Sequence, residues 1–321
     1  MLDVMFYEVF DREEESLRRY IPKSIKADFT WKTVQEHGES APPAKVISIR
    51  TQSLVPNNWA EKLSGILTRS AGYDHIIAYL NENKLSLPCG YLIDYCSRTV
   101  AEQAILLMMA LMRRLKVQMK QFEEFQRDNM TGAECFGKNL LVVGAGHIGG
   151  HILRLGRALE MNVKAVDIAE NIKAVEYVTL EKGIVWADIV VCSAALTHRT
   201  RGMLGYQSLS KAKKGCILVN IARGEISPVD ELRKLLDEEK LAAVALDVFE
   251  REGLLAQKLR EFVSDEQTRG ILDLSRRENV VFTPHNAFNT REALERKAKE
   301  SVESLQSFFQ SGSFLHPVPT E

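Results

Sequence analysis

The chain has 321 residues, of which 45% are hydrophobic and 26% are charged, as expected for a soluble globular protein with two domains of ordinary size. A formal net charge of −1 provides no field that would recruit nucleic acid or an anionic membrane, so we expect neither as a partner. The five cysteines have scattered spacing and form no CxxC, which favours reduced thiols in a cytoplasmic protein without a metal site. The first residues, MLDVMFYEVFDREEE, lack the basic segment of a signal peptide. The apolar run Ala104–Met112 is far shorter than the ~20 residues of a membrane span.

The N-terminal part of the chain alternates between strand-like and helical patterns. Strands are expected at Asp3–Tyr7, Asp28–Trp31, Val46–Ile49 and Ile66–Thr68, with helical stretches such as Glu13–Tyr20 between some of them. One long helix is then predicted from about Thr99 to Arg127, apolar at first and charged later.

A second and clearer alternation begins at Lys138, where Leu140–Val143 has the continuous apolar character of a buried parallel strand. A helix follows Gly144, and its apolar face is formed by Ile148, Ile152, Leu155 and Leu159. Further strands are expected at Val163–Val166, Ile189–Ser193, Cys216–Ile221, Val244–Val248 and Val280–Thr283. This alternation predicts an α/β fold with a doubly wound parallel sheet and helices on both faces.

Three smaller features complete the predicted organisation. Ser227 is expected to cap a helix whose first residue is Pro228. Residues 250–279 are rich in charge and predict a helical insertion on the surface. The last helix, about Arg291–Gln310, has no strand after it, and we expect it to return to the first domain.

The most specific motif is Gly144-Ala145-Gly146-His147-Ile148-Gly149, which matches GxGxxG between a strand and an amphipathic helix. Asp167 ends the next strand, and this context is the fingerprint of a dinucleotide site. The glycines let the backbone approach a pyrophosphate, whose charge the helix N-terminus stabilises. A carboxylate at Asp167 would accept hydrogen bonds from ribose hydroxyls and repel a 2′-phosphate, which favours NAD over NADP.

Polar residues follow three of the later strands. Arg223 could hold a carboxylate with its planar set of donors, or it could simply pin a loop. The acidic residues in Leu246–Glu252 would form a solvated turn in most proteins. Near a histidine, one of their carboxylates could instead form a hydrogen bond with the imidazole ring. His285, alone after its strand, would more often be structural. A carboxylate bonded to an imidazole fixes the tautomer and favours imidazolium, so that the histidine can act as an acid near neutral pH.

Taken together and in order, these motifs resemble the NAD-dependent D-2-hydroxyacid dehydrogenases over about residues 45–310. Two further stretches, Thr68–Asp74 and Tyr95–Gln103, fit the same family. The resemblance implies a Rossmann dinucleotide-binding domain at residues 98–287. It also implies a smaller flavodoxin-like substrate domain at residues 1–97, completed by residues 288–321. A homodimer formed through the helix region Thr99–Arg127 is likewise implied.

The resemblance also implies roles for individual residues. Arg223 would bind the carboxylate of a small 2-oxo acid and polarise its ketone. His285 would donate a proton to the ketone oxygen as hydride arrives from NADH, and Glu252 would pair with His285. Asp247 would contact the nicotinamide side of NAD, and Ala71, Gly72 and Tyr95 would face the substrate together with Arg223. The implied cofactor-binding residues are Gly144, Gly146, His147, Ile148, Gly149, Asp167, Ser193, Ala195, Thr200, Ile221, Ala222, Arg223, Asp247 and His285.

Some positions depart from the family pattern, which often has Pro at the positions of Ala195 and Arg98 and His at that of Gln103. An aromatic residue, Phe288, stands just past His285, and this arrangement resembles the D-lactate dehydrogenase branch of the family more than the glycerate branches. Two alternatives stay open because a fold does not fix a function. One is an NAD-sensing, corepressor-like binding protein, and the other is a formate or phosphite dehydrogenase of the same architecture.

Overall fold

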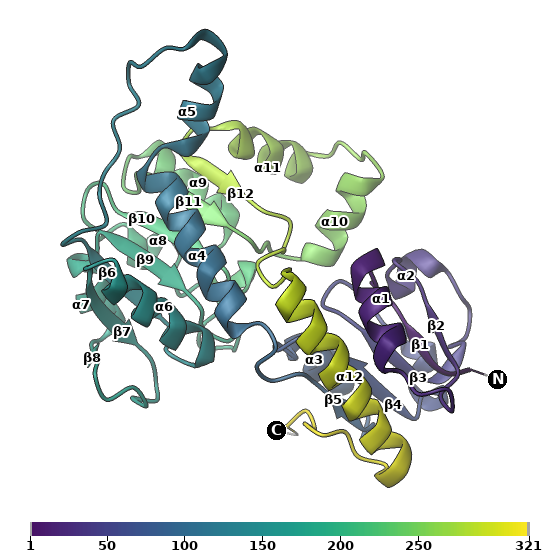
Figure 1. Ribbon diagram of the computed structural model, residues 1–321. Coiled ribbons are helices and arrows are strands. Elements are labelled where there is room, and N and C mark those ends of the chain that lie inside the picture. The colour runs from purple at the N-terminus through teal and green to yellow at the C-terminus, as the bar shows by residue number, and fades with distance from the viewer. Residues whose placement is uncertain (1, 320–321) are drawn as a thin grey trace. The chain divides into compact units, whose positions relative to one another are not determined.

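The computed structural model describes residues 2–319, and the chain divides into two compact units (Figure 1). One unit comprises Met1–Cys96 and Asn289–Glu321, and the other comprises Ser97–Phe288. We refer to them as the N-terminal unit and the central unit.

The N-terminal unit is built on a five-stranded parallel sheet with the order β2-β1-β3-β4-β5. This is the strand order of flavodoxin-like folds, so the expectation of a smaller flavodoxin-like α/β unit is confirmed. The strands are β1 (Leu2–Phe6), β2 (Ala27–Phe29), β3 (Ala44–Ile49), β4 (Gly65–Thr68) and β5 (Cys89–Gly90).

Helices from both ends of the chain cover this sheet. They are α1 (Asp11–Tyr20), α2 (Val34–His37), η1 (Asn57–Lys62), α3 (Asp74–Asn83) and α12 (Arg291–Ser311). Helix α12 lies beside α1 (Figure 1), and Glu295 accepts hydrogen bonds from Ser16 Oγ at 3.0 Å and from Tyr20 Oη at 2.6 Å. The C-terminal helix is therefore part of the same unit as the first strands.

A group of buried charges, which the sequence analysis did not predict, joins α1 and α12 to the end of β4. Glu13 Oε1 lies 2.9 Å from Arg69 Nε and 2.7 Å from Lys297 Nζ, and all three side chains have no exposed surface. Burial would raise the pKa of Glu13, but Lys297 and Arg69 outweigh it and lower that pKa to about 2. Burial lowers the pKa of Lys297 to about 7; Glu13 opposes this shift, whereas Arg50 and Arg69 add to it.

The central unit contains a seven-stranded parallel sheet with the order β12-β11-β10-β9-β6-β7-β8. Read from β8 to β11, this is the 3-2-1-4-5-6 order of a doubly wound Rossmann sheet, as predicted, with β12 added at one edge. The order reverses between β6 and β9, which is the point where such sheets bind ligands. The strands are β6 (Asn139–Val143), β7 (Asn162–Val166), β8 (Glu176–Tyr177), β9 (Ile189–Cys192), β10 (Ile217–Asn220), β11 (Ala243–Leu246) and β12 (Val280–Phe282).

The predicted long helix from Thr99 to Arg127 is wrong in its second half. Helix α4 (Ser97–Met112) ends two residues before Arg114, which has the left-handed φ of 51°. A short α5 (Leu115–Gln121) and a 3-10 turn, η2 (Phe122–Glu124), follow. The left-handed backbone of Arg114 ends the run of helical residues, and α5 starts again after it.

The other helices of the central unit are α6 (His147–Ala158), α7 (Leu180–Trp186), α8 (Tyr206–Leu209), η3 (Gly224–Ile226), α9 (Val229–Asp237), α10 (Glu252–Arg260) and α11 (Glu266–Arg276). Helices α10 and α11 confirm the helical insertion predicted for residues 250–279. The predicted cap of α9 is wrong by one residue, because Pro228 occupies the cap position. Ser227 Oγ instead accepts a hydrogen bond from Asn220 Nδ2 at 2.6 Å, and Glu250 Oε2 accepts one from Val229 N at 3.2 Å.

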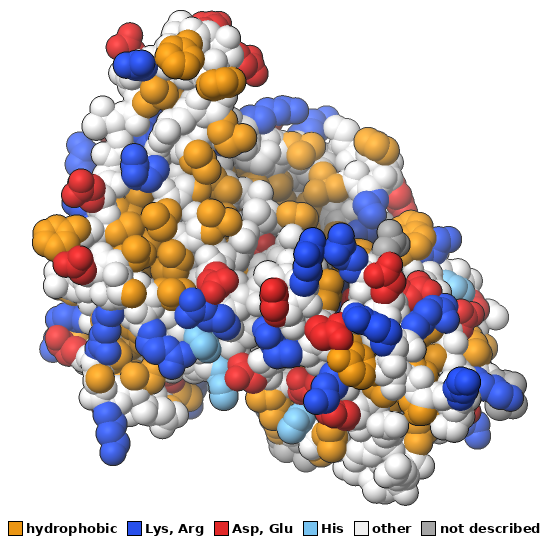
Figure 2. All heavy atoms as spheres, in the orientation of Figure 1, with side chains coloured by type: hydrophobic (Ala, Val, Ile, Leu, Met, Phe, Trp, Pro, Cys, Tyr) orange, Lys and Arg blue, Asp and Glu red, His pale blue; other side chains and the backbone are white. Residues whose placement is uncertain are grey.

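Large apolar side chains are exposed along α4, α5 and η2, where Figure 2 shows hydrophobic atoms gathered on the surface. We call this set the α4–α5 apolar surface; it comprises Leu106, Met109, Leu115, Met119, Phe122 and Phe125. Within residues 2–319, no helix combines the length and the hydropathy needed to cross a membrane.

Candidate active site

The polar residues predicted from the central unit follow adjacent strands of one parallel sheet. Arg223 follows β10, Asp247 and Glu252 follow β11, and His285 follows β12. Because the strands are parallel and neighbouring, their carboxyl ends meet at one edge, which brings these side chains into one region.

His285 and Glu252 form the central pair of this region. Glu252 Oε1 lies 2.7 Å from His285 Nδ1, and the two side chains retain only 16% and 19% of their exposure. The carboxylate is an acceptor, so the proton of this hydrogen bond lies on Nδ1. His285 Nε2 makes no hydrogen bond to any described residue. The pair therefore leaves one ring nitrogen available for proton exchange.

Asp247 holds the backbone that carries His285. Its carboxylate is fully buried and accepts hydrogen bonds from Thr283 Oγ1 at 2.5 Å, Asn286 N at 2.9 Å and Ala287 N at 2.9 Å. Burial raises the pKa of Asp247, and these donors together with the nearby His285 oppose the shift. These hydrogen bonds matter because His285 has a left-handed φ of 50°, which is unfavourable for a residue with a Cβ.

Asn220 fixes the loop that presents Arg223. Its side chain donates to Arg223 O at 2.8 Å and accepts from Ala222 N at 2.9 Å, and Asn220 is fully buried. The same loop approaches the segment after β11 closely, since a Cβ on Gly224 would lie 2.0 Å from the carbonyl carbon of Phe249. Arg223 itself is half-buried, with Nη1 donating to Ala222 O at 2.8 Å.

The glycine motif lies at the point where the strand order reverses. Gly144 has a φ of 91°, and a Cβ on Gly149 would lie 1.9 Å from Gly144 O, so neither position accepts a side chain without rearrangement. Gly146 is the N-cap of α6 and, as a glycine, supplies no side-chain cap to the first turn, which begins with His147 and Ile148. A helix start of this kind can hold an anion, so these residues fit the pyrophosphate of a dinucleotide.

The other predicted cofactor residues follow neighbouring strands of the same sheet, and two of them contact the glycine turn. Asp167 follows β7 and accepts hydrogen bonds from Ala145 N at 2.5 Å and Ala169 N at 2.9 Å. Ser193 Oγ donates to Gly144 O at 2.7 Å, which ties β9 to the glycine loop. Thr200 Oγ1 donates to Ala195 O at 2.7 Å and closes the loop after β9. Ile221 and Ala222 are buried after β10.

The remaining predicted residues, Ala71, Gly72 and Tyr95, belong to the N-terminal unit. Ala71 and Gly72 are half-buried in the loop between β4 and α3. Tyr95 is buried, which raises the pKa of its hydroxyl, and its carbonyl accepts a hydrogen bond from Arg296 Nε at 2.8 Å.

Sequence reasoning missed two residues that shape the site, Asn220 and Thr283. Both stand beside residues that it selected, and both are polar at the carboxyl end of a buried strand. That position was the signal that could have identified them.

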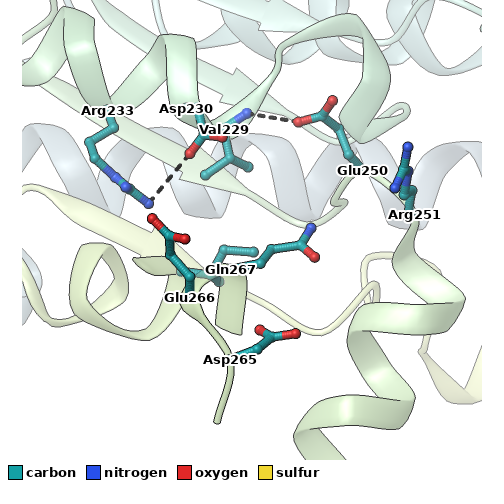
Figure 3. A pocket seen from close by; sticks show the side chains of 9 residues that line it. Val229, Asp230, Arg233, Glu250, Arg251, Asp265, Glu266 and Gln267 are labelled. Atoms are coloured by element: carbon teal, nitrogen blue, oxygen red, sulfur yellow. Dashed lines mark hydrogen bonds and ion pairs between the residues drawn. The ribbon is translucent and has the colours of Figure 1, made fainter. Parts of the chain in front are cut away.

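A cavity of about 470 Å³ lies elsewhere in the central unit, between α9 and the inserted helices (Figure 3). None of the predicted site residues lines it. Its lining is strongly polar and consists of Val229, Asp230, Arg233, Glu250, Arg251, Asp265, Glu266, Gln267 and Ile271. Within residues 2–319, no cluster of three or more His, Cys, Asp or Glu side chains could hold a metal ion.

Comparison with known proteins agrees with this geometry. The sequence pattern of the D-isomer specific 2-hydroxyacid dehydrogenase NAD binding domain matches residues 105–287. The D-specific alpha-keto acid dehydrogenase of Enterococcus faecalis is 30% identical over 254 residues, which cover 77% of this chain and 76% of that protein. The D-lactate dehydrogenase of Escherichia coli is 29% identical over 250 residues, 75% of each chain.

Among solved structures, D-lactate dehydrogenase from Aquifex aeolicus, complexed with NAD and lactic acid, superposes with a TM-score of 0.85 at 25% identity. The superposition covers 99% of this chain and 100% of that one. The chain belongs to the D-isomer specific 2-hydroxyacid dehydrogenase family. It is an NAD-dependent oxidoreductase that acts on the CH–OH group of its donors.

Proposed function

We propose that this enzyme reduces a small 2-oxo acid to the D-2-hydroxy acid with NADH, reversibly, and that His285 is the proton donor. The observation that carries this proposal is the 2.7 Å contact between His285 Nδ1 and Glu252 Oε1. This contact orients the ring, while Nε2 remains available to a substrate.

In the proposed mechanism, NADH held in the central unit would supply the hydride for the ketone carbon. His285 Nε2 gives its proton to the ketone oxygen at the same time, and the imidazole takes the proton back in the oxidation direction. Glu252 stabilises the imidazolium that this requires. The guanidinium of Arg223 binds the substrate carboxylate and polarises the ketone.

The cofactor residues divide by the part of NAD that they would hold. The glycine turn and the start of α6 would bind the pyrophosphate, through Gly144, Gly146, His147, Ile148 and Gly149. Asp167 would accept hydrogen bonds from the adenosine ribose. Ser193, Ala195, Thr200, Ile221, Ala222, Arg223, Asp247 and His285 would line the pocket toward the nicotinamide. The central unit would thus be the dinucleotide-binding domain, residues 98–287 in our assignment.

The N-terminal unit would be the substrate domain, residues 1–97 and 288–321 in our assignment. There, Ala71, Gly72 and Tyr95 would face the substrate. The backbone N–H groups of Ala71 and Gly72 donate no hydrogen bond within residues 2–319, which leaves them open to a carboxylate.

We place the enzyme near the D-lactate dehydrogenase branch, with a small 2-oxo acid as substrate. Phe288 supports this choice: it is buried three residues after His285, where an aromatic is typical of that branch. The names of the relatives, a D-specific alpha-keto acid dehydrogenase and a D-lactate dehydrogenase, agree with a small 2-oxo acid.

We also propose a cytoplasmic homodimer that uses the α4–α5 apolar surface. Its six large apolar side chains are exposed in the isolated chain, and patches of this kind mark interaction sites. Sedimentation of the wild type against a Met119→Lys variant tests this proposal. We expect a dimer for the wild type and a monomer for the variant, and a monomeric wild type would contradict it.

The proposed activity is tested with a panel of 2-oxo acids, followed by NADH absorbance, with NADPH in parallel. We expect turnover of at least one 2-oxo acid with NADH and a lower kcat/KM with NADPH. No turnover across the panel would favour an NAD-sensing binding protein, and activity confined to formate or phosphite would favour that branch. Equal use of NADPH would contradict the role of Asp167.

A further inference from the structure

The loop after β4 is anchored by its first two residues. Arg69 N donates to Ile49 O at 2.8 Å, and Leu92 N donates to Ser70 O at 3.1 Å. The buried Arg69 side chain also donates to Tyr7 O at 2.7 Å and to Ser48 O at 2.9 Å. These bonds join the start of the loop to β3 and to the residues just after β1 and β5, so the conformational freedom that remains lies in the residues after Ser70.

A chain of three hydrogen bonds acts on that remaining part. Thr68 Oγ1 lies 2.9 Å from His75 Nε2 and 2.7 Å from Ser70 Oγ, and Ser70 Oγ donates to Gly72 O at 2.6 Å. Thr68 is fully buried and Ser70 is 8% exposed. The chain thus spans the loop from the last residue of β4 to the first turn of α3.

The direction of this chain follows from counting protons. A hydroxyl has one proton, and that of Ser70 is used toward Gly72 O, so Ser70 Oγ accepts from Thr68. The proton of Thr68 is then used as well, so Thr68 Oγ1 accepts from His75. His75 must therefore be protonated at Nε2, and every donor in the chain points toward the Gly72 carbonyl.

This direction determines how the loop presents itself to an anion. The Gly72 carbonyl, which would repel a carboxylate, is held toward the Ser70 hydroxyl. The N–H groups of Ala71 and Gly72 stay without an internal acceptor among the described residues. A loop without the hydroxyl chain could rotate its peptide planes and turn a carbonyl toward the substrate.

We propose that Thr68, Ser70 and His75 are positioning residues, which hold the amides of Ala71 and Gly72 in the orientation that binds the substrate carboxylate. This inference rests on the proposed function, in which those amides contact the 2-oxo acid. None of the three side chains takes part in proton or hydride transfer. Their loss should therefore weaken substrate binding and leave the rate of the chemical step nearly unchanged.

The kinetic test compares Thr68→Val and Ser70→Ala with the wild type. We expect KM for the 2-oxo acid to rise about 10- to 100-fold, while kcat changes less than about threefold and NADH affinity is unchanged. Thr68→Ser keeps the hydroxyl and should restore most of the affinity. Thr30→Val is the matched control, because it makes the same change just after β2 in the same unit.

An unchanged KM in both folded variants, or a loss confined to kcat, would overturn the proposal. If Thr68→Val fails to fold, Ser70→Ala, which removes a single oxygen atom, decides the question by itself. Failure of the proposed function looks different, because the wild type itself would then reduce no 2-oxo acid.

The second measurement needs no turnover. Nitrogen-15 NMR of the wild type reports the protonation of each ring nitrogen of His75, identified by its loss in His75→Gln. We expect a proton on Nε2, and a ring protonated on Nδ1 alone would overturn the direction of the chain.

Discussion

Replacement of Asp247 by Asn should release the loop that carries His285. In the wild type, Oδ1 accepts from Thr283 and Asn286, and Oδ2 accepts from Ala287. An amide side chain has one oxygen, so in either orientation its NH₂ group faces at least one of these donors. The better orientation loses the bond to Ala287 and turns a charged acceptor into a neutral one.

The magnitude follows from these contacts. One hydrogen bond to a charged group contributes about 1.5–3 kcal/mol. The left-handed backbone of His285, with φ of 50°, costs about 1–2 kcal/mol and persists only while the loop is held. The lost bond is similar in free energy to the backbone strain or larger, so His285 should leave its position beside Glu252 for much of the time. We expect kcat to fall about 10- to 100-fold.

The assay measures kcat at saturating NADH and 2-oxo acid, NADH affinity by fluorescence, and the free energy of unfolding. Thr283→Val is the intermediate case, because it removes one donor and keeps the carboxylate and both backbone bonds. The expected order of kcat is wild type, Thr283→Val, then Asp247→Asn. If Asp247→Asn lost only NADH affinity and kept its kcat, the reasoning about the His285 loop would be refuted.

Two more predictions concern other parts of the molecule. Gly149→Ala should lower both thermal stability and NADH affinity, because its Cβ would lie 1.9 Å from Gly144 O. Gly146→Ala should lower NADH affinity with little change in thermal stability, because its Cβ would have no atom within 4 Å. Equal melting temperatures for these two variants would contradict the close approach. Lys297 has its pKa lowered from 10.5 to about 7, whereas the unfolded chain keeps that proton up to the higher value. Between these pH values the unfolded state binds more protons than the folded state, so raising the pH favours the folded state. The free energy of unfolding of the wild type, measured by urea denaturation, should therefore rise by up to about 1.4 kcal/mol per pH unit relative to that of Lys297→Met. Parallel curves for the two proteins would show that Lys297 keeps its proton.

The parts of the site that depend on local patterns were predictable from the sequence. The glycine turn needs only a strand, a glycine motif and a helix in sequence order, and all three are local. Glu252 and His285 are far apart in the chain, yet each follows a strand of one parallel sheet, and that topology brings them together. Strand alternation therefore predicted the neighbourhood, and the resemblance predicted the pairing.

Other features depend on packing between distant segments and have no local signature. A lysine within a helix such as α12 is normally expected to be exposed to solvent. Lys297 is buried against Glu13 only because α12 packs on α1. The break after α4 depends on one left-handed residue, Arg114, in a segment of good helix formers. The hydrogen-bond chain through Thr68 could not be predicted either, because it requires the conformation of the loop after β4.

The most direct test of the central claim is the turnover of His285→Ala with NADH and the 2-oxo acid that the wild type uses. Loss of the proton donor should lower kcat about 10²- to 10⁴-fold, as is usual when general acid catalysis is removed. NADH affinity should stay close to that of the wild type, since the glycine turn is intact. A variant that keeps wild-type turnover on every substrate would contradict the assignment of His285 as the proton donor.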